Sequence, residues 1–221
     1  MNDHFRWNQG EHMVILAPTG AGKTTLISEI LPKRKYNIIF GTKKADEMYD
    51  FIERNRGYRR VESFDEIKHW ERNILLWPKH EGTIRQTYAK QRNVFIDALN
   101  HIVKQGGWST WFDEMKYMHG PLRMGPELTF MYEQMRSIKS TVIGAAQRPM
   151  DIPLSALTNA THSFLWKNTK AEDAKRLADI GGIDAKEVQA ELKTLGAREF
   201  LYIKTRGTEA HIVRTQVERK A

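Results

Sequence analysis

The sequence predicts an α/β protein in which a mainly parallel sheet carries helices on both faces and ends in a C-terminal hairpin. Three observations lead to this prediction. Short apolar runs alternate with segments of helical spacing over most of the chain, which indicates strands joined by crossover helices. A glycine-rich segment at residues 17–24 directly follows the first apolar run, Met13–Leu16. Near the end, Phe200–Lys204 and His211–Thr215 flank Arg206-Gly207, as the strands of a hairpin flank their turn.

The predicted strands are short apolar runs, several of them rich in β-branched side chains. Pro78 stops the fourth run, because proline cannot donate to the hydrogen-bond ladder of a sheet. In chain order, the predicted strands before the hairpin are Met13–Leu16, Tyr36–Phe40, Arg60–Phe64, Ile74–Trp77, Trp108–Phe112, Thr141–Ala146 and Ser163–Trp166.

The predicted helices follow from apolar spacing and from residues that start or stop helices. Pro32 ends the first helix, and Pro126 suits the first turn of the fourth. Thr169 and Asp184 each stand three residues before a glutamate, which is the spacing of a capping box, and Gly181-Gly182 ends the first of the two helices that these caps begin. The four earlier helices are Thr24–Leu31, Ala45–Arg54, Ile84–Gln105 and Pro126–Ile138.

The composition limits the class of protein. The chain has 221 residues, so we expect residues 1–221 to form a single domain. It has no cysteine, which excludes a disulfide framework, a thiol nucleophile and a cysteine metal site. Met1–Arg6 has no apolar core and no apolar run is as long as a membrane span, so we expect neither a signal peptide nor a membrane helix and expect the protein in the cytoplasm. The formal net charge of +8 favours a polyanionic partner such as nucleic acid, and a soluble basic domain is the alternative.

A phosphate-binding loop is the most specific motif in the chain. Residues 17–24 read APTGAGKT, with alanine in place of the usual first glycine. Gly20 and Gly22 let the backbone wrap closely around phosphate oxygens, so that amide N–H groups donate to them. Lys23 brings a positive charge to the β- and γ-phosphates, and the Thr24 hydroxyl is a ligand for Mg²⁺. We therefore expect ATP at the N-terminus of the following helix, bound by Thr19, Gly20, Ala21, Gly22, Lys23, Thr24 and Thr25.

Two adjacent carboxylates, Asp113 and Glu114, follow the predicted strand Trp108–Phe112. At the carboxyl edge of a parallel sheet, Asp113 would hold a water of the Mg²⁺ shell, and Glu114 would act as the general base that activates the attacking water. Adjacent acids at a strand end are also common on protein surfaces, and the phosphate-binding loop favours the functional interpretation. The other acidic pair, Asp46-Glu47, lies in a helical segment, where we expect a solvent-exposed face.

A third polar group follows the apolar run Thr141–Ala146. Gln147 would emerge at the same sheet edge, where its amide would bond the γ-phosphate or the attacking water; the alternative is a strand end that faces solvent. Arg136 stands near the end of the preceding helix. It would either reach the nucleotide site of a neighbouring subunit or be an exposed helix-end arginine that favours the helix dipole. Arg148 is either a second ligand or an ion-pair partner.

Taken together, these motifs resemble the FtsK/HerA group of DNA-pumping ATPases. The phosphate-binding loop, the Asp113-Glu114 pair and the triplet Gln147-Arg148-Pro149 occur in the order of that group, with Arg136 at the spacing that the group has before its triplet. Leu195–Leu201 also resembles the late Gly-turn-strand segment of the group, so the resemblance spans nearly the whole chain. The small size is most similar to the genome-packaging ATPases of viruses and phages, a subgroup of the same family.

The resemblance implies a P-loop NTPase fold of the ASCE, RecA-like type and a homo-oligomeric ring, often a hexamer, with ATP and Mg²⁺ between subunits. It also implies DNA as the partner, a capsid vertex or portal protein as the anchor, and a location in the host cytoplasm or on the virion. The residue roles that it implies are phosphate and metal binding by Lys23 and Thr24, metal binding by Asp113, water activation by Glu114, γ-phosphate sensing by Gln147 and an arginine finger in trans from Arg136.

The segment after Glu114 is the candidate for DNA contact. It is basic and partly aromatic, and we expect it to be a flexible loop in which Lys116 and Arg123 contact the phosphate backbone. A solvated loop without a partner is the alternative. Contact through phosphates would be independent of base sequence and would weaken steeply with salt.

Three classes of function remain open from the residues alone. They are a DNA-translocating motor, a small-molecule phosphotransferase such as a nucleotide kinase, and a nucleotide-switched assembly or secretion factor. A kinase needs neither Glu114 directly after Asp113 nor the triplet that begins at Gln147. DNA-stimulated ATP hydrolysis would identify the motor, and slow hydrolysis that ignores DNA would identify the switch.

Overall fold

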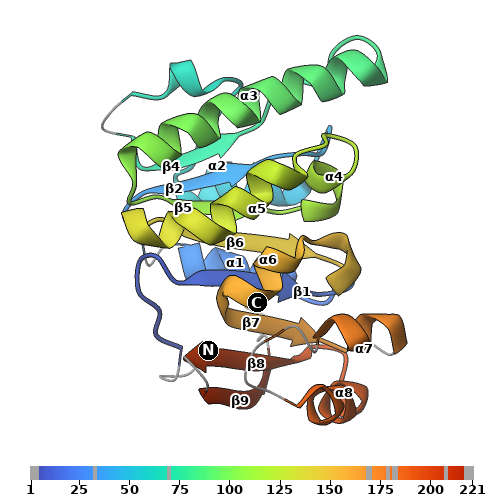
Figure 1. The fold of residues 1–221 in the computed structure, drawn as a ribbon. Helices are drawn as coiled ribbons and strands as arrows, with labels where there is room; N and C mark the ends of the chain where they lie inside the picture. The colour runs from blue at the N-terminus through green and yellow to red at the C-terminus, as the bar shows by residue number, and fades with distance from the viewer. Residues whose placement is uncertain are drawn as a thin grey trace.

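The protein forms one nine-stranded sheet, here described from a computed structural model over residues 5–31, 34–68, 71–167, 171–177, 180, 184–206 and 209–216. The strand order is β3-β4-β2-β5-β6-β1-β7-β8-β9 (Figure 1). The strands are β1 (His12–Leu16), β2 (Asn37–Phe40), β3 (Arg59–Val61), β4 (Asn73–Leu76), β5 (Ser109–Phe112), β6 (Thr141–Ala146), β7 (Ala160–Trp166), β8 (Glu199–Arg206) and β9 (Glu209–Gln216).

Helices connect most of these strands. The α-helices are α1 (Lys23–Ile30), α2 (Glu47–Arg56), α3 (Ile84–Gln105), α4 (Met115–His119), α5 (Gly125–Gln134), α6 (Leu154–Asn159), α7 (Ala171–Leu177) and α8 (Ala185–Thr194). Short 3₁₀ helices are η2 (Phe64–Glu66), η3 (Met135–Ile138) and η4 (Pro149–Asp151). In the part of the chain that the structure describes, no helix combines the length and the apolar character needed to span a lipid bilayer.

The sheet is parallel from β3 to β7 and antiparallel at β8 and β9. This confirms the predicted mainly parallel sheet with a C-terminal hairpin. Strand β6 lies between β1 and β5, and Ile143 is in register with Met13 on one side and with Trp111 on the other. The carboxyl ends of β1, β5 and β6 therefore meet at one edge of the sheet, on the right in Figure 1.

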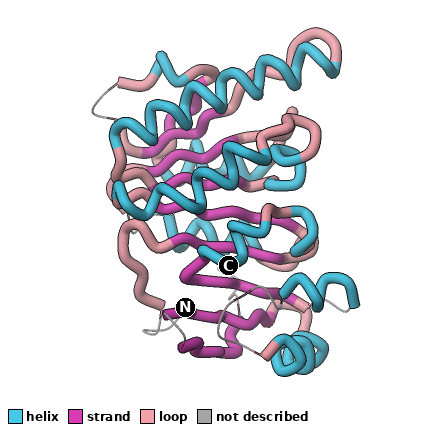
Figure 2. The backbone as a smooth tube through the Cα atoms, in the orientation of Figure 1, coloured by secondary structure: helices cyan, strands magenta, loops and turns pink. Residues whose placement is uncertain are grey.

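Helices cover both faces of the sheet, as predicted, because successive side chains of each strand point to opposite faces. Val14 and Leu16 belong to a core that includes Phe95 of α3 and Leu128 of α5. Ile15 belongs to a second core that includes side chains of α1 and α2. The helices of the first core, α3 and α5, lie in front of the sheet in Figure 2. The sheet is thus buried on both sides, and its carboxyl edge presents loops.

Three local predictions need correction, and one helix was missed. The strand predicted at Arg60–Phe64 ends at Val61, because a capping box closed by Glu66 begins η2 there. The helix predicted to Ile138 finishes as the 3₁₀ helix η3. The expected flexible loop at residues 116–123 begins as helix α4, whose Met115 and Met118 are fully buried. Helix α6 was not predicted. The predicted cap Thr169, the helix end Gly181-Gly182 and the turn glycine Gly207 lie outside the described residues.

Candidate nucleotide site

The glycine-rich loop leaves β1 at the carboxyl edge and enters α1 directly. Gly20 and Gly22 have left-handed backbones, with φ of 78° and 104°, which favour glycine. A Cβ on Gly20 would meet no atom within 4 Å, so Gly20 is needed for its backbone angle and not for close packing. Gly22 is the N-cap of α1, which places the first amide groups of that helix beside the loop. This is the geometry of an anion-binding site.

A cavity of about 430 Å³ lies over this loop. It brings together every predicted nucleotide-site residue except Ala21 and Arg136. Ala21 packs in the core, and its backbone N–H donates to Pro18 O at 3.3 Å. The residues that line the cavity are Ala17, Pro18, Thr19, Gly20, Gly22, Lys23, Thr24, Thr25, Lys43, Asp46, Met48, Asp113, Glu114 and Gln147.

Asp113 is the most buried carboxylate of the cavity, with 1% of its surface exposed. Its Oδ2 accepts a hydrogen bond from the Tyr49 hydroxyl at 3.1 Å and lies 3.7 Å from Lys43 Nζ. Its Oδ1 lies 3.5 Å from Lys23 Nζ. Burial and the Asp113 charge raise the pKa of Tyr49 well above its usual range, so the tyrosine stays a hydrogen-bond donor. The protein thus fixes the orientation of this carboxylate.

The same carboxylate fits a cation. Among the described residues, Asp113 Oδ1 is buried without a hydrogen-bond partner, and the Thr24 hydroxyl lines the same cavity. A hydroxyl and a carboxylate, with phosphate oxygens, are the ligands that Mg²⁺ takes in nucleotide sites. Nowhere in the described ranges do three or more histidine, aspartate or glutamate side chains form a metal-binding group of their own. The residues present therefore suit a metal bound together with a nucleotide.

Glu114 and Gln147 border the cavity from two neighbouring strands, β5 and β6. Glu114 is half-buried and occupies the N-cap position of α4, so the helix that carries Lys116 starts at the predicted base. Gln147 is exposed and belongs to the cavity wall. The register of β5 and β6 brings both residues to the edge where the sequence placed them.

The β2–α2 loop supplies two cavity residues that the sequence analysis missed, Lys43 and Asp46. The expectation of a solvent-exposed face at Asp46 is wrong. Asp46 caps α2 by accepting from Met48 N at 2.9 Å, and it forms an ion pair with Lys43 at 2.5 Å. Partial burial opposes the charge of Lys43, but the hydrogen bond to Asp46 and the charge of Asp113 raise its pKa overall. Polar residues directly after a predicted strand, at Gly41–Lys44, were the available signal.

Arg136 lies away from this cavity. It belongs to η3, before the start of β6, and donates to Asn159 O at 3.1 Å and to Thr161 Oγ1 at 3.0 Å. A Cβ on Gly10, which precedes β1, would contact Arg136, so this arginine sits at the amino edge of the sheet. Any contact of Arg136 with a nucleotide site would therefore be with the site of another copy.

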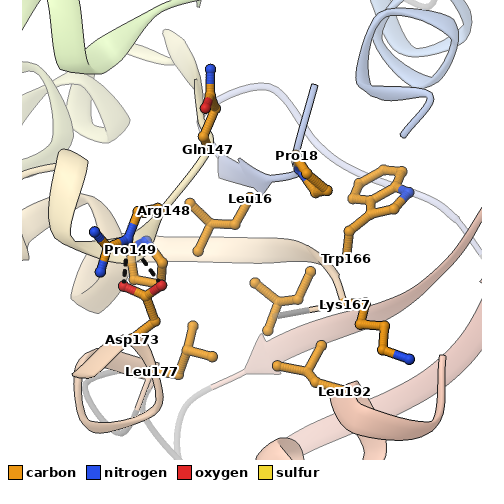
Figure 3. A pocket seen from close by; sticks show the side chains of 11 residues that line it. Leu16, Pro18, Gln147, Arg148, Pro149, Trp166, Lys167, Asp173, Leu177 and Leu192 are labelled. Carbon is orange, nitrogen blue, oxygen red and sulfur yellow. Dashed lines mark hydrogen bonds and ion pairs between the residues drawn. The ribbon is translucent and has the colours of Figure 1, made fainter. Parts of the chain in front are cut away.

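A second cavity of about 270 Å³ adjoins the first, and Pro18 and Gln147 line both. Figure 3 shows its apolar side chains below the phosphate-binding loop, with Arg148 and Asp173 paired at one side. The Arg148 Nε–Asp173 Oδ2 distance is 3.1 Å, so Arg148 is an ion-pair partner in this structure. The other lining residues are Leu16, Pro149, Leu165, Trp166, Lys167, Leu177 and Leu192.

Comparison with solved structures identifies the fold. The chain aligns with B204, the DNA-packaging ATPase from Sulfolobus turreted icosahedral virus, with a TM-score of 0.65 and 18% identity, over 96% of this chain and 100% of that one. The chain has the fold of a genome-packaging NTPase. B204 from Sulfolobus turreted icosahedral virus 2, solved in complex with AMP, aligns with a TM-score of 0.65 and 14% identity, over 94% and 98% of the two chains.

Larger ATPases share the fold. EssC (ATPases 2 and 3) from Geobacillus thermodenitrificans aligns with a TM-score of 0.56 and 12% identity, over 96% of this chain and 40% of that one. No protein-family model matches the sequence, and no curated protein matches it either. The alignments with solved structures confirm the P-loop NTPase fold that the resemblance implied.

Proposed function

We propose that the protein is an ATP-hydrolysing motor that translocates DNA, and that its cargo is the genome of a virus or phage. The observation that carries the proposal is the convergence of the predicted residues, from Lys23 to Gln147, on one cavity at the carboxyl edge of the sheet. The fold shared with the genome-packaging NTPase B204 supports this choice of cargo. Residues 1–221 would act as one ATPase domain, in the host cytoplasm or on the virion.

The chemistry follows from the residues. Lys23 and the loop amides bind the phosphates, and Glu114 accepts a proton from the attacking water, which bonds the Gln147 amide. Thr24 and Asp113 would hold Mg²⁺, which neutralises phosphate charge when bound. The apolar walls of the second cavity suit the nucleoside, since that cavity begins where the phosphate-binding loop begins.

The proposed active form is a ring, because the described residues that line the cavity include no arginine that could neutralise the charge developing on the transferred phosphate. Among the residues lining the cavity the cations are lysines, Lys23 and Lys43. Arg136 of a neighbouring copy would supply this charge, a contribution that elsewhere amounts to about 10³–10⁵ in rate. A capsid vertex or portal protein would anchor the ring.

DNA contact is proposed for Lys116 and Arg123, both exposed. Lys116 lies two residues after Glu114, on helix α4, whose N-cap position Glu114 occupies, and its ammonium is 3.4 Å from Asp151. A movement of Glu114 during hydrolysis would therefore also move Lys116, the residue proposed to contact DNA.

The test is the ATPase rate of the full chain with and without double-stranded DNA, across a salt series. We expect DNA to raise the rate and salt to suppress this stimulation. Glu114→Gln should lower turnover at least about 10²-fold while ATP binding persists, since only the base is lost. Glu47→Gln, an exposed acid on α2, is the matched control and should behave as wild type.

Each other outcome contradicts part of the proposal. Wild-type turnover in Glu114→Gln would remove Glu114 from the mechanism. Slow hydrolysis that DNA leaves unchanged would favour a nucleotide-switched assembly or secretion factor. Phosphate transfer to a small acceptor in the absence of DNA would favour a nucleotide kinase.

A further inference from the structure

The β2–α2 loop brings a second lysine into the nucleotide cavity. Lys43 Nζ lies 2.5 Å from Asp46 Oδ2 and 3.7 Å from Asp113 Oδ2, and its side chain forms part of the cavity wall. Asp113 therefore faces two ammonium groups, since Lys23 approaches its other oxygen at 3.5 Å. Lys43 already neutralises Asp46, and at 3.7 Å its contact with Asp113 is longer than a hydrogen bond. This longer contact can be exchanged for one to another anion in the same cavity.

The backbone around Lys43 is held by side chains from two other parts of the chain. Trp77 Nε1 donates to Lys43 O at 2.6 Å, and the Gln91 amide donates to Thr42 O at 3.3 Å. A Cβ on Gly41 would lie 3.0 Å from the Trp77 ring, so the tryptophan packs directly on this loop. A loop whose carbonyls are bound in this way fixes the direction in which its side chains leave the backbone. The Lys43 side chain extends from there to Asp46 and Asp113.

Gln91 is the centre of this arrangement and is fully buried on α3. Its Nε2 lies 2.8 Å from His80 Nε2, and its Oε1 accepts a hydrogen bond from the Tyr117 hydroxyl at 2.6 Å. Burying a polar side chain is costly unless its groups are paired, and here each group has a partner. Tyr117 belongs to α4, the helix that Glu114 begins. The network therefore joins the Lys43 loop to the helix of the predicted base.

We propose that Lys43 is a second cation for the terminal phosphate of the bound nucleotide, and that the Gln91–Tyr117 network is what holds it in place. This inference rests on the function proposed above, because it assigns a further binding residue and a positioning network to the same site. Lys43 leaves Asp113 when a terminal phosphate is present and binds that phosphate. Tyr117 makes this contact depend on the position of α4, and so on the segment proposed to meet DNA.

The experiment compares ATPγS with ADP, which differ by the terminal phosphate. Binding of each to the full chain is measured by calorimetry with Mg²⁺ for wild type, Lys43→Met and Lys44→Met. Lys44 is exposed and does not line the cavity, so it is the matched control. Lys43→Met should lower the affinity for ATPγS about tenfold or more, since one charge-assisted hydrogen bond is lost, and should change the affinity for ADP less than about threefold.

The network has its own variants. Tyr117→Phe removes only the hydroxyl that bonds Gln91, and should lower ATPγS affinity about threefold with ADP unchanged. Tyr88→Phe is the control, because the Tyr88 ring packs edge to face on the Tyr117 ring and the substitution keeps that ring contact. An unchanged ratio of ATPγS to ADP affinity in Tyr117→Phe would overturn the role of the network.

The outcomes separate this inference from the proposed function. Equal losses for ATPγS and ADP in Lys43→Met would mean that Lys43 only neutralises carboxylates, and would overturn the inference while the nucleotide site stands. Failure of wild type to bind ATPγS at all would instead remove the proposed function, and this inference with it.

Discussion

Gly144, in the middle of β6, is the position where a single methyl group should damage both stability and activity. A Cβ on Gly144 would lie closer than 3.0 Å to Met115 Sδ and to Tyr132 Oη, a separation that real Cβ atoms do not show. The Tyr132 hydroxyl donates to Met13 O at 3.0 Å and is buried, so it has no room to move without breaking this bond.

The cost of Gly144→Ala is the sum of two effects. Overfilling a packed core costs about 1–3 kcal/mol. Breaking the buried hydrogen bond of Tyr132 adds about 1–3 kcal/mol, because both partners lose their pairing. We therefore expect a loss of about 2–6 kcal/mol from an unfolding free energy of about 5–15 kcal/mol. Urea unfolding followed by circular dichroism would measure it.

A double-mutant cycle makes the assignment specific. Tyr132→Phe removes one of the two overlapping atoms, so in the Gly144→Ala background it should be at least about 1 kcal/mol less destabilising than in wild type. Gly57→Ala is the control, because a Cβ there meets nothing within 4 Å and only the backbone strain of about 1 kcal/mol remains. A Gly144→Ala variant within about 0.5 kcal/mol of wild type, or strict additivity with Tyr132→Phe, would refute the reasoning.

Gly144→Ala should also lower ATPase activity, because the displaced residue Met115 directly follows Glu114. Displacing the Met115 side chain shifts the start of α4 and the carboxylate that begins it. Gly144→Ala should lose ATPase activity even at low temperature, where the protein stays folded, whereas Gly57→Ala should keep it.

Two further predictions concern other residues. In mixtures of Arg136→Ala and Lys23→Ala subunits, each inactive alone, ATP hydrolysis should recover in part, because hybrid rings contain sites with both residues intact; no recovery at any ratio would argue against an arginine acting in trans. Burial and the nearby Arg136 charge lower the pKa of His12 to about 3. The unfolded chain then binds a proton that the folded chain does not, so stability falls as the pH drops below the ordinary pKa near 6.5. From pH 7 to pH 5 this effect amounts to about 2 kcal/mol. In His12→Asn, the amide oxygen can accept the Val142 N–H in place of the His12 ring nitrogen. Between pH 7 and pH 5, the free energy of unfolding of this variant, measured by urea titration, should fall by about 2 kcal/mol less than that of wild type. Equal falls would contradict the assignment.

The sequence predicted the elements whose cause is local. The phosphate-binding loop was predictable because Gly20 and Gly22 are required by backbone angle, and Ile84–Gln105 because its apolar face repeats over many turns. Asp113 and Gln147 were predictable because parallel strands expose their carboxyl ends at one edge.

What the sequence did not reveal depends on packing between distant segments. Lys43 enters the site only because β2 pairs with β5, and nothing local to residues 37–43 specifies that neighbour. Helix α4 is five residues long and is stabilised by burial of Met115 and Met118 rather than by intrinsic propensity. The prediction for Arg136 came from motif spacing, and spacing alone does not specify on which edge of the sheet a residue lies. The structure places Arg136 at the amino edge.

Strand β3 ends the sheet on one side, and its chemistry limits how copies of the protein can meet. It is only three residues long, Arg59 is bound to Glu71 at 2.6 Å, and Arg60 covers the Trp77 ring at 4.0 Å. A short border strand with two charged side chains is a poor template for a foreign strand. The β3 edge therefore disfavours strand pairing between neighbouring copies of the protein. Copies that lie side by side, as in a ring, would be expected to make contact through other surfaces.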